Sequence, residues 1–143
     1  MIDYQVYRLV HLFGIFALYL ALGGLFLHAL NGGTKESNTN RKSVAILHGV
    51  AMFLVLLGGF GMLARIGQHP HQVWVLMKLG VWLVLGAMMV IPYRLPALAR
   101  PIWLALPLVG ILAAWIAYEK PGQKDDYSVP AEEAVVDGSA HLG

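Results

Sequence analysis

Four apolar segments, each close to the length that crosses a lipid bilayer, constrain this chain more than any other feature. They cover residues 6–30, 43–64, 73–91 and 102–118, and none of the eight acidic residues falls inside them. A helix that spans the hydrocarbon takes roughly 20 predominantly apolar residues. Because backbone polar groups in lipid must be satisfied internally, such segments predict helices. We therefore expect an all-α integral membrane protein, an up-down bundle of four transmembrane helices.

The composition agrees with a membrane domain. Hydrophobic residues make up 58% of the chain and charged residues only 13%, whereas soluble domains hold about a quarter charged residues. The absence of cysteine excludes disulfides, iron–sulfur clusters and thiolate zinc sites within this chain. The net charge of +2 is too small and too scattered to favour nucleic acid as a partner. Membrane lipid is the expected surrounding.

Turn-forming residues separate the expected helices. The segment NGGTKESNTN at 31–40 is a polar loop. Pro101 fits the first turn of the last helix, and Pro107 should kink that helix because it removes a backbone donor. The end of the chain is polar, acidic and rich in proline and glycine. We expect a transmembrane domain over 1–118 and a flexible acidic tail over 119–143.

Four spans place both termini on the same side of the membrane. The loops on the other side carry five basic residues: Lys35, Arg41, Lys42, Arg94 and Arg100. Cytoplasmic loops carry an excess of lysine and arginine. The sequence therefore favours a multi-pass protein of the bacterial inner membrane with both termini outside the cytoplasm.

Three histidines and one lysine lie within the expected spans, where ionisable groups are costly and usually have a partner. At about 1.5 Å per residue, His48 lies about 8 Å and His28 about 3 Å inside the same membrane face. His11 lies near the opposite face, at a depth close to that of Lys78, and about 20 Å from His48 along the membrane normal. His28 and His48 are thus predicted to be able to share one cofactor, whereas His11 and His48 are not.

A b-type haem is the leading hypothesis for the pair His48 and His28. Such a haem is held by one or two imidazoles and needs little further sequence signature. Its propionates require cations at the membrane surface, and Arg94 and Arg100 lie on the appropriate side. We expect a role in electron or proton transfer, with a quinone or a redox protein as partner. No catalytic motif is present, so any enzymatic activity is expected to be that of an oxidoreductase.

A second candidate site and two other functions stay open. His11 and Lys78 form a set that suits haem, a quinone headgroup or a lipid phosphate. Met52 follows His48 by four residues on the same helix face, and thioether plus imidazole, with His28 as a further ligand, suits copper. Alternatively, His48 only bonds a neighbouring carbonyl, and the protein is a non-catalytic structural or interaction protein. Glycine-rich stretches in the first two spans favour close helix packing, within the chain or in a homo-oligomer.

Three stretches together resemble a loose group of small four-helix bacterial membrane proteins. YRLVHLFGIF places a histidine early in the first span, ILHGVAMFLVLLGGFGML ends the second span with a glycine-rich turn, and VWVLMKLGVWLVLGAMMV places a lysine four residues after a tryptophan. The group comprises the SirB family, the membrane protoporphyrinogen oxidases of the HemJ type and the copper-resistance protein D family. The resemblance covers about residues 7–118.

This resemblance implies haem b binding. The HemJ-type histidine and lysine match His11 and Lys78, and the SirB-like second-span histidine matches His48. The chain also departs from both patterns. Gly49 and Val50 follow His48 where SirB-like proteins have Asp-Thr, and the histidine of the HemJ-type W-L-H-V-K stretch is missing. Protoporphyrinogen oxidation is therefore not carried over to this chain.

Overall fold

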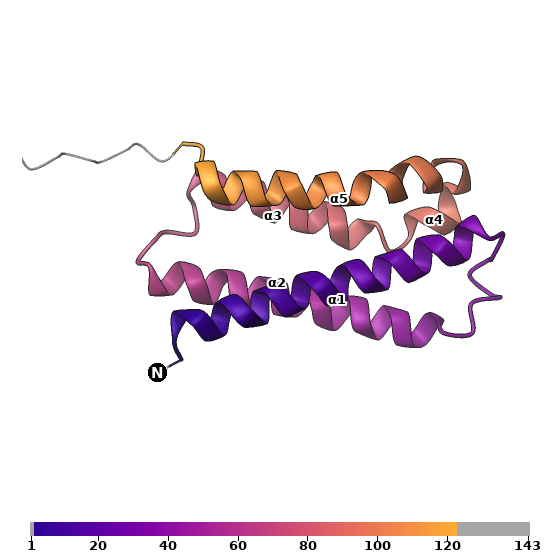
Figure 1. The fold of residues 1–143 in the computed structure, drawn as a ribbon, viewed down its shortest axis with the longest axis horizontal. Coiled ribbons are helices and arrows are strands. Elements are labelled where there is room, and N and C mark those ends of the chain that lie inside the picture. Colours follow the sequence, from indigo (N-terminus) through magenta and orange to yellow (C-terminus); the bar gives the residue numbers. More distant parts are fainter. Residues whose placement is uncertain (1, 123–143) are drawn as a thin grey trace, which may run out of the picture.

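The computed structural model describes residues 2–122, and within this range the ordered elements are all helices (Figure 1). The bounds of the five helices are α1 Tyr4–Leu30, α2 Arg41–Arg65, α3 Val73–Ala87, α4 Ile91–Arg94 and α5 Pro96–Glu119. By length and composition, α1, α2 and α5 could each cross a membrane, whereas α3 is a shorter apolar helix. Residues 123–143, which include most of the predicted tail, lie outside the described range.

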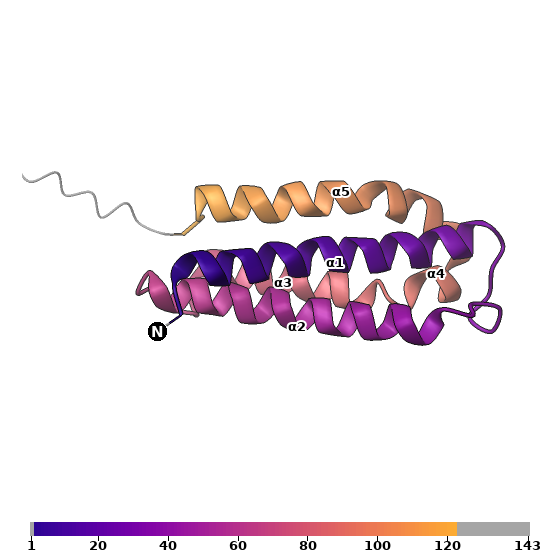
Figure 2. The same cartoon turned by 60° about the horizontal axis from the view of Figure 1, so that its bottom comes forward.

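Figure 1 shows the long elements as two pairs, α1 with α2 and α3 with α5, that run lengthwise through the molecule, and the turned view of Figure 2 shows α5 beside α1. Helix α1 packs closely along α2, α5 contacts both α1 and α3, and α2 meets α3 through side chains that include His48 and Trp82. The pairs are joined by contacts of α1 with α4 and α5. The start of α1, the end of α2, the start of α3 and the end of α5 therefore meet at one end of the molecule, called the open end below.

Two glycines let α1 and α2 approach closely. A Cβ atom added at Gly14 would lie 2.8 Å from the backbone nitrogen of Val55, and one at Gly58 would lie 2.7 Å from the backbone nitrogen of His11. Real Cβ atoms do not reach such distances, so only glycine fits. Small residues at membrane helix crossings have this effect. The sequence predicted close packing for the stretches that hold Gly58 and Gly23–Gly24; it is found at Gly58, whereas an added Cβ at Gly23 or Gly24 would meet nothing within 4 Å, and Gly14 was not predicted.

The third predicted span is interrupted. Helix α3 ends at Ala87, a turn follows, and α4 resumes at Ile91, whereas the sequence predicted one helix over 73–91. Pro92 supplies the physical reason, because its ring clashes with the carbonyl one turn earlier and it donates no hydrogen bond. At 15 residues, α3 is about 22 Å long.

The last helix begins earlier than predicted. It starts at Pro96 rather than near residue 102, and the chain turns sharply between α4 and α5 at Leu95. Pro96, not Pro101, therefore occupies the first turn, where the missing N–H is harmless. Pro101 and Pro107 both lie inside α5. The prediction for Pro101 was wrong because a second proline upstream offered the same start signal.

The larger part of the core lies between the pairs, away from the open end, and a smaller buried cluster of Leu63, Trp74, Val75 and Ile116 lies near that end. The buried residues that form the larger part are Ala17, Leu18, Leu22, Phe26, Ala51, Met52, Leu85, Ala99 and Leu106. The outer faces are also apolar, with Phe16 and Leu20 of α1 at least 70% exposed. An apolar exterior around so small a core suits lipid as the surrounding solvent.

Candidate cofactor site

A cavity of about 560 Å³ lies between the two helix pairs and extends toward the open end. All four long elements contribute to its walls, which are mainly apolar. Among residues 2–122, none of those that line it is acidic. Its polar and aromatic lining consists of Tyr4, Arg8, His11, Tyr19, Phe60, Trp74, Lys78, Trp82 and Lys120.

His11 is held by a single hydrogen bond across the α1–α2 contact. Its Nδ1 lies 2.7 Å from the carbonyl oxygen of Val55 and therefore donates to it. The ring passes beside Gly59, where an added Cβ would be only 3.5 Å from Cε1. A donating Nδ1 leaves Nε2 with its lone pair, the form in which histidine ligates metals. His11 lines the cavity, and its bond to Val55 leaves Nε2 available to a ligand.

Two lysines approach one indole at the mouth of the cavity. Lys78 Nζ lies 5.9 Å from the ring centroid of Trp74, and Lys120 Nζ lies 6.0 Å from the same centroid. Trp74 is buried, and its Nε1 donates to Oε1 of Gln72 at 2.6 Å. Cation–π contacts at such distances are favourable. The indole therefore holds two cations, from α3 and from the end of α5, beside the cavity.

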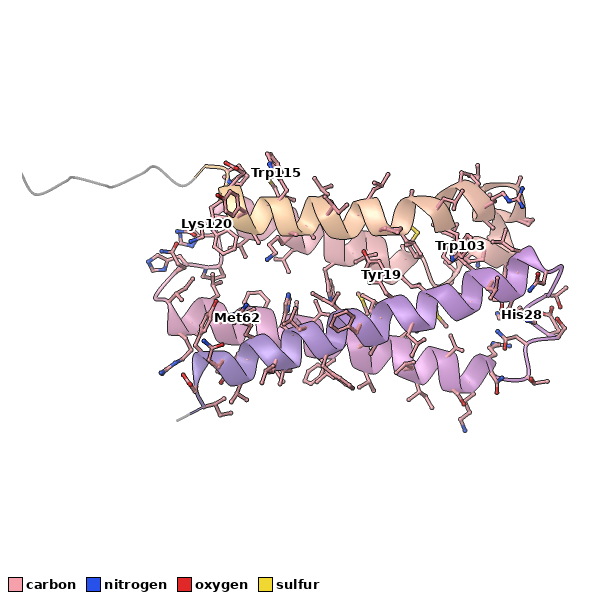
Figure 3. All side chains as sticks on the ribbon, viewed as in Figure 1. Tyr19, His28, Met62, Trp103, Trp115 and Lys120 are labelled. Atoms are coloured by element: carbon pink, nitrogen blue, oxygen red, sulfur yellow. The ribbon has the colours of Figure 1, made fainter. Side chains whose placement is uncertain are left out.

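The inner end of the cavity is closed by two side chains that tie neighbouring helices together. The Tyr19 hydroxyl donates to the carbonyl of Leu106 at 2.9 Å, which links α1 to α5. Trp82 Nε1 donates to the carbonyl of Met52 at 3.0 Å, which links α3 to α2. These bonds connect the helix pairs beside the cavity; Figure 3 shows Tyr19 between α1 and α5.

His48 is buried and its bond explains why an imidazole lies in an apolar helix. Its Nε2 lies 3.3 Å from the carbonyl oxygen of Leu85, to which it donates. Because α3 ends at Ala87, the amide of Met89 bonds to Gly86 instead of Leu85. The Leu85 carbonyl is thus one of the orphan acceptors of a helix end. His48 satisfies it, as the structural alternative in the sequence analysis expected.

His28 lies at the other end of the molecule, beside the loop that follows α1 (Figure 3). Its Nε2 is 3.1 Å from the carbonyl oxygen of Thr34 and 3.3 Å from Oγ of Ser37. The ring also contacts Tyr93 of α4 edge-on, at 6.3 Å between centroids. Neither His28 nor His48 lines the cavity. The structure therefore places these two rings in separate surroundings, each with a local acceptor.

The other predicted ligands lie around those two histidines. Arg94 and Arg100 are exposed. Met52 is buried on the same side of α2 as His48, and its methyl group lies against Gly86 of α3. Within residues 2–122, no three histidine, aspartate or glutamate side chains come together as a metal site.

Sequence reasoning brought together His11 and Lys78, and both line the cavity. It did not identify Tyr19, Trp82 or Lys120. A signal for Trp82 was present, because Trp74, Lys78 and Trp82 recur every four residues and so share one face of α3. Lys120 carried no such signal, since it lies where the polar tail was expected to begin.

Comparison with known proteins gave no match, whether with protein families, with curated proteins or with solved structures. The resemblance to the SirB, HemJ-type and copper-resistance group therefore stays a prediction.

Proposed function

We propose that this chain is a membrane protein that binds haem b in the cavity at its open end, where His11 would hold the iron. The group would supply one-electron redox chemistry, and the protein would serve electron or proton transfer with a quinone or a redox protein as partner. This assignment moves the leading ligand from the predicted pair His48 and His28 to the second candidate site.

The hydrogen bond of His11 is the observation that carries this proposal. A histidine that ligates a metal almost always donates its other ring nitrogen to a carbonyl or carboxylate. His11 Nδ1 already makes that bond to Val55, at 2.7 Å. In contrast, the Nε2 atoms of His28 and His48 are each directed to a carbonyl. Among these three histidines, only His11 combines a bonded Nδ1 with a place in the cavity wall.

The other residues that line the cavity suit the remainder of a haem molecule. Cofactor cavities are mostly apolar, measure about 300–1,000 Å³ and carry a few placed polar groups. Propionates need cations, and Arg8, Lys78 and Lys120 are the cationic residues in the lining. No lining carboxylate competes with them. The residues present therefore fit an amphipathic, dianionic tetrapyrrole.

The membrane arrangement that we propose has four passes in the bacterial inner membrane. The third pass would consist of α3, the turn and α4 together. Helix α3 alone is shorter than the hydrocarbon layer of about 30 Å, whereas residues 73–94 are numerous enough to cross it. Helices broken in this way occur in membranes where the freed backbone groups find other partners. The basic loops then favour both termini outside the cytoplasm.

A reduced-minus-oxidised absorption spectrum of the protein in mild detergent tests the proposal. We expect a Soret peak with α and β bands in the wild type, its loss in His11→Ala, and its partial return when imidazole is added to that variant. His28→Ala is the matched control and should keep the spectrum. Loss in His28→Ala and His48→Ala, with His11→Ala unaffected, would instead support the pair predicted from the sequence.

Copper handling is the second candidate, because His48 and Met52 lie together against α3. It predicts bound copper without a Soret band, which elemental analysis of the same sample decides. A sample without iron, copper or any chromophore would favour a structural or interaction protein.

A further inference from the structure

The mouth of the cavity gathers positive charge that no neighbouring side chain in its lining neutralises. Lys78 and Lys120 each place Nζ about 6 Å from the centroid of Trp74. The two nitrogens are therefore at most about 12 Å apart. Arg8 lines the same cavity, and none of the described residues in its lining is acidic. Like charges repel each other, and an anion bound between them would relieve that repulsion.

The backbone at Lys120 directs its side chain to this place. Lys120 is the C-cap of α5 and adopts a left-handed conformation with φ +44°, a region that favours glycine. The chain then turns at Pro121 and Gly122, and a Cβ atom at Gly122 would lie 3.0 Å from Cβ of Val73. This turn brings the end of α5 against the start of α3. The Lys120 ammonium thereby lies beside the ring of Trp74.

The location suits a ligand that comes from the membrane. The open end is where four helix ends meet, so Trp74 and Lys120 lie at the level expected for headgroups, where tryptophan and lysine are enriched. Basic pockets between membrane helices bind anionic headgroups. Below the cations, the cavity is walled mainly by apolar side chains. A charged head and an apolar body would therefore both find complementary surroundings.

We propose that Lys78 and Lys120 form an oxyanion site that binds the carboxylate or phosphate head of an amphiphile whose apolar chain enters the cavity. This inference concerns the haem-free protein, because an amphiphile and a haem would compete for the same cavity and the same cations; it does not require iron. It assigns Lys120 as a residue that selects charged over neutral amphiphiles.

Quenching of tryptophan fluorescence by brominated amphiphiles tests this site on the full chain in neutral detergent. Trp103 and Trp115 lie on α5 outside the cavity lining, so both are replaced by phenylalanine. The remaining fluorescence comes from Trp74 and Trp82, which line the cavity. The probes are dibromostearate, its uncharged methyl ester and brominated phosphatidylglycerol.

We expect dibromostearate or brominated phosphatidylglycerol to quench at concentrations at least tenfold lower than the methyl ester. Quenching by the fatty acid indicates a carboxylate ligand, and quenching by the phospholipid alone indicates a lipid phosphate. Lys120→Gly should weaken binding of the charged probe about tenfold, the usual value of a charge-assisted contact, and leave the ester unchanged. Glycine suits the left-handed C-cap, so this variant should keep its thermal stability.

Matched variants separate this site from other effects. Lys35→Gly makes the same replacement in the loop at the opposite end and should bind like the parent, while Lys120→Arg should restore binding. Because the probes are titrated into haem-free protein, the oxyanion site and the haem proposal can fail independently. Equal affinity for acid, phospholipid and ester, or unchanged binding in Lys120→Gly, would overturn the inference.

Discussion

Gly58 is the position where a single methyl group tests the packing on which His11 depends. A Cβ atom at Gly58 would lie 2.7 Å from both the nitrogen and Cβ of His11 and 2.7 Å from the carbonyl oxygen of Tyr7. Ordinary contacts measure about 3.5–4.0 Å, so α1 and α2 would have to separate by roughly 1 Å. Overpacking of this kind costs about 1–3 kcal/mol. We expect Gly58→Ala to lower the free energy of unfolding by this amount and to lengthen the bond from His11 to Val55.

Gly59→Ala is the matched control one residue away. Its added methyl group would lie no closer than 3.5 Å to His11, an ordinary contact, and alanine is favoured over glycine in helices by up to about 1 kcal/mol. Unfolding in mixed micelles of rising dodecyl sulfate content, followed by circular dichroism, measures both variants. If Gly58→Ala were as stable as Gly59→Ala, the close approach of α1 and α2 at this point would be refuted.

Two further substitutions remove side-chain hydrogen bonds to backbone carbonyls, one that lacks a helical partner and one that has it. His48→Leu should destabilise the protein by about 1–3 kcal/mol, because it leaves the buried Leu85 carbonyl without a donor. The same micelle titration measures this loss. An unchanged unfolding midpoint would contradict the role of His48 in capping α3. Tyr19→Phe should lower the free energy of unfolding by only about 0.6 kcal/mol, the average for side-chain hydrogen bonds in membranes. The Leu106 carbonyl lies inside α5 and keeps its helical partner. A loss of stability as large as that of His48→Leu would contradict this reasoning.

The apolar pattern predicted the long helices well because lipid leaves the backbone few alternatives. The polar loop at 31–40 and the end of the second span were placed within one or two residues of their observed positions. The interruption after Ala87 was not predicted, since every residue around it is apolar and hydropathy is insensitive to a turn. Only Pro92, which disfavours helix in the preceding turn, indicates the interruption in the sequence. That the interruption frees the Leu85 carbonyl to accept a hydrogen bond from His48 could not be predicted from the sequence.

The cavity could be predicted only in part. Depth along the membrane brought His11 and Lys78 together, and that estimate depends on helix rise alone. Which helices lie side by side depends on packing: α1 lies against α2 through Gly14 and Gly58, and this contact directs His11 to Val55. Lys120 joins the site through a left-handed backbone conformation. The sequence does not predict this conformation for a lysine in a polar stretch.

His11 and His48 have the same sequence signal, because each is a lone histidine in an apolar helix. The carbonyls that accept their hydrogen bonds differ, since one lacks a helical partner and the other has one. Leu85 lies at the end of α3, where its carbonyl has lost its helical partner, so the bond from His48 satisfies the backbone. Val55 lies inside α2, where its carbonyl has an amide four residues on, so the bond from His11 orients the ring instead. His48 substitutions should therefore reduce stability more than cofactor content, and His11 substitutions the reverse. Measuring unfolding midpoint and Soret absorbance on the same two alanine variants decides this, and equal losses in both would show that neither ring has a separate role.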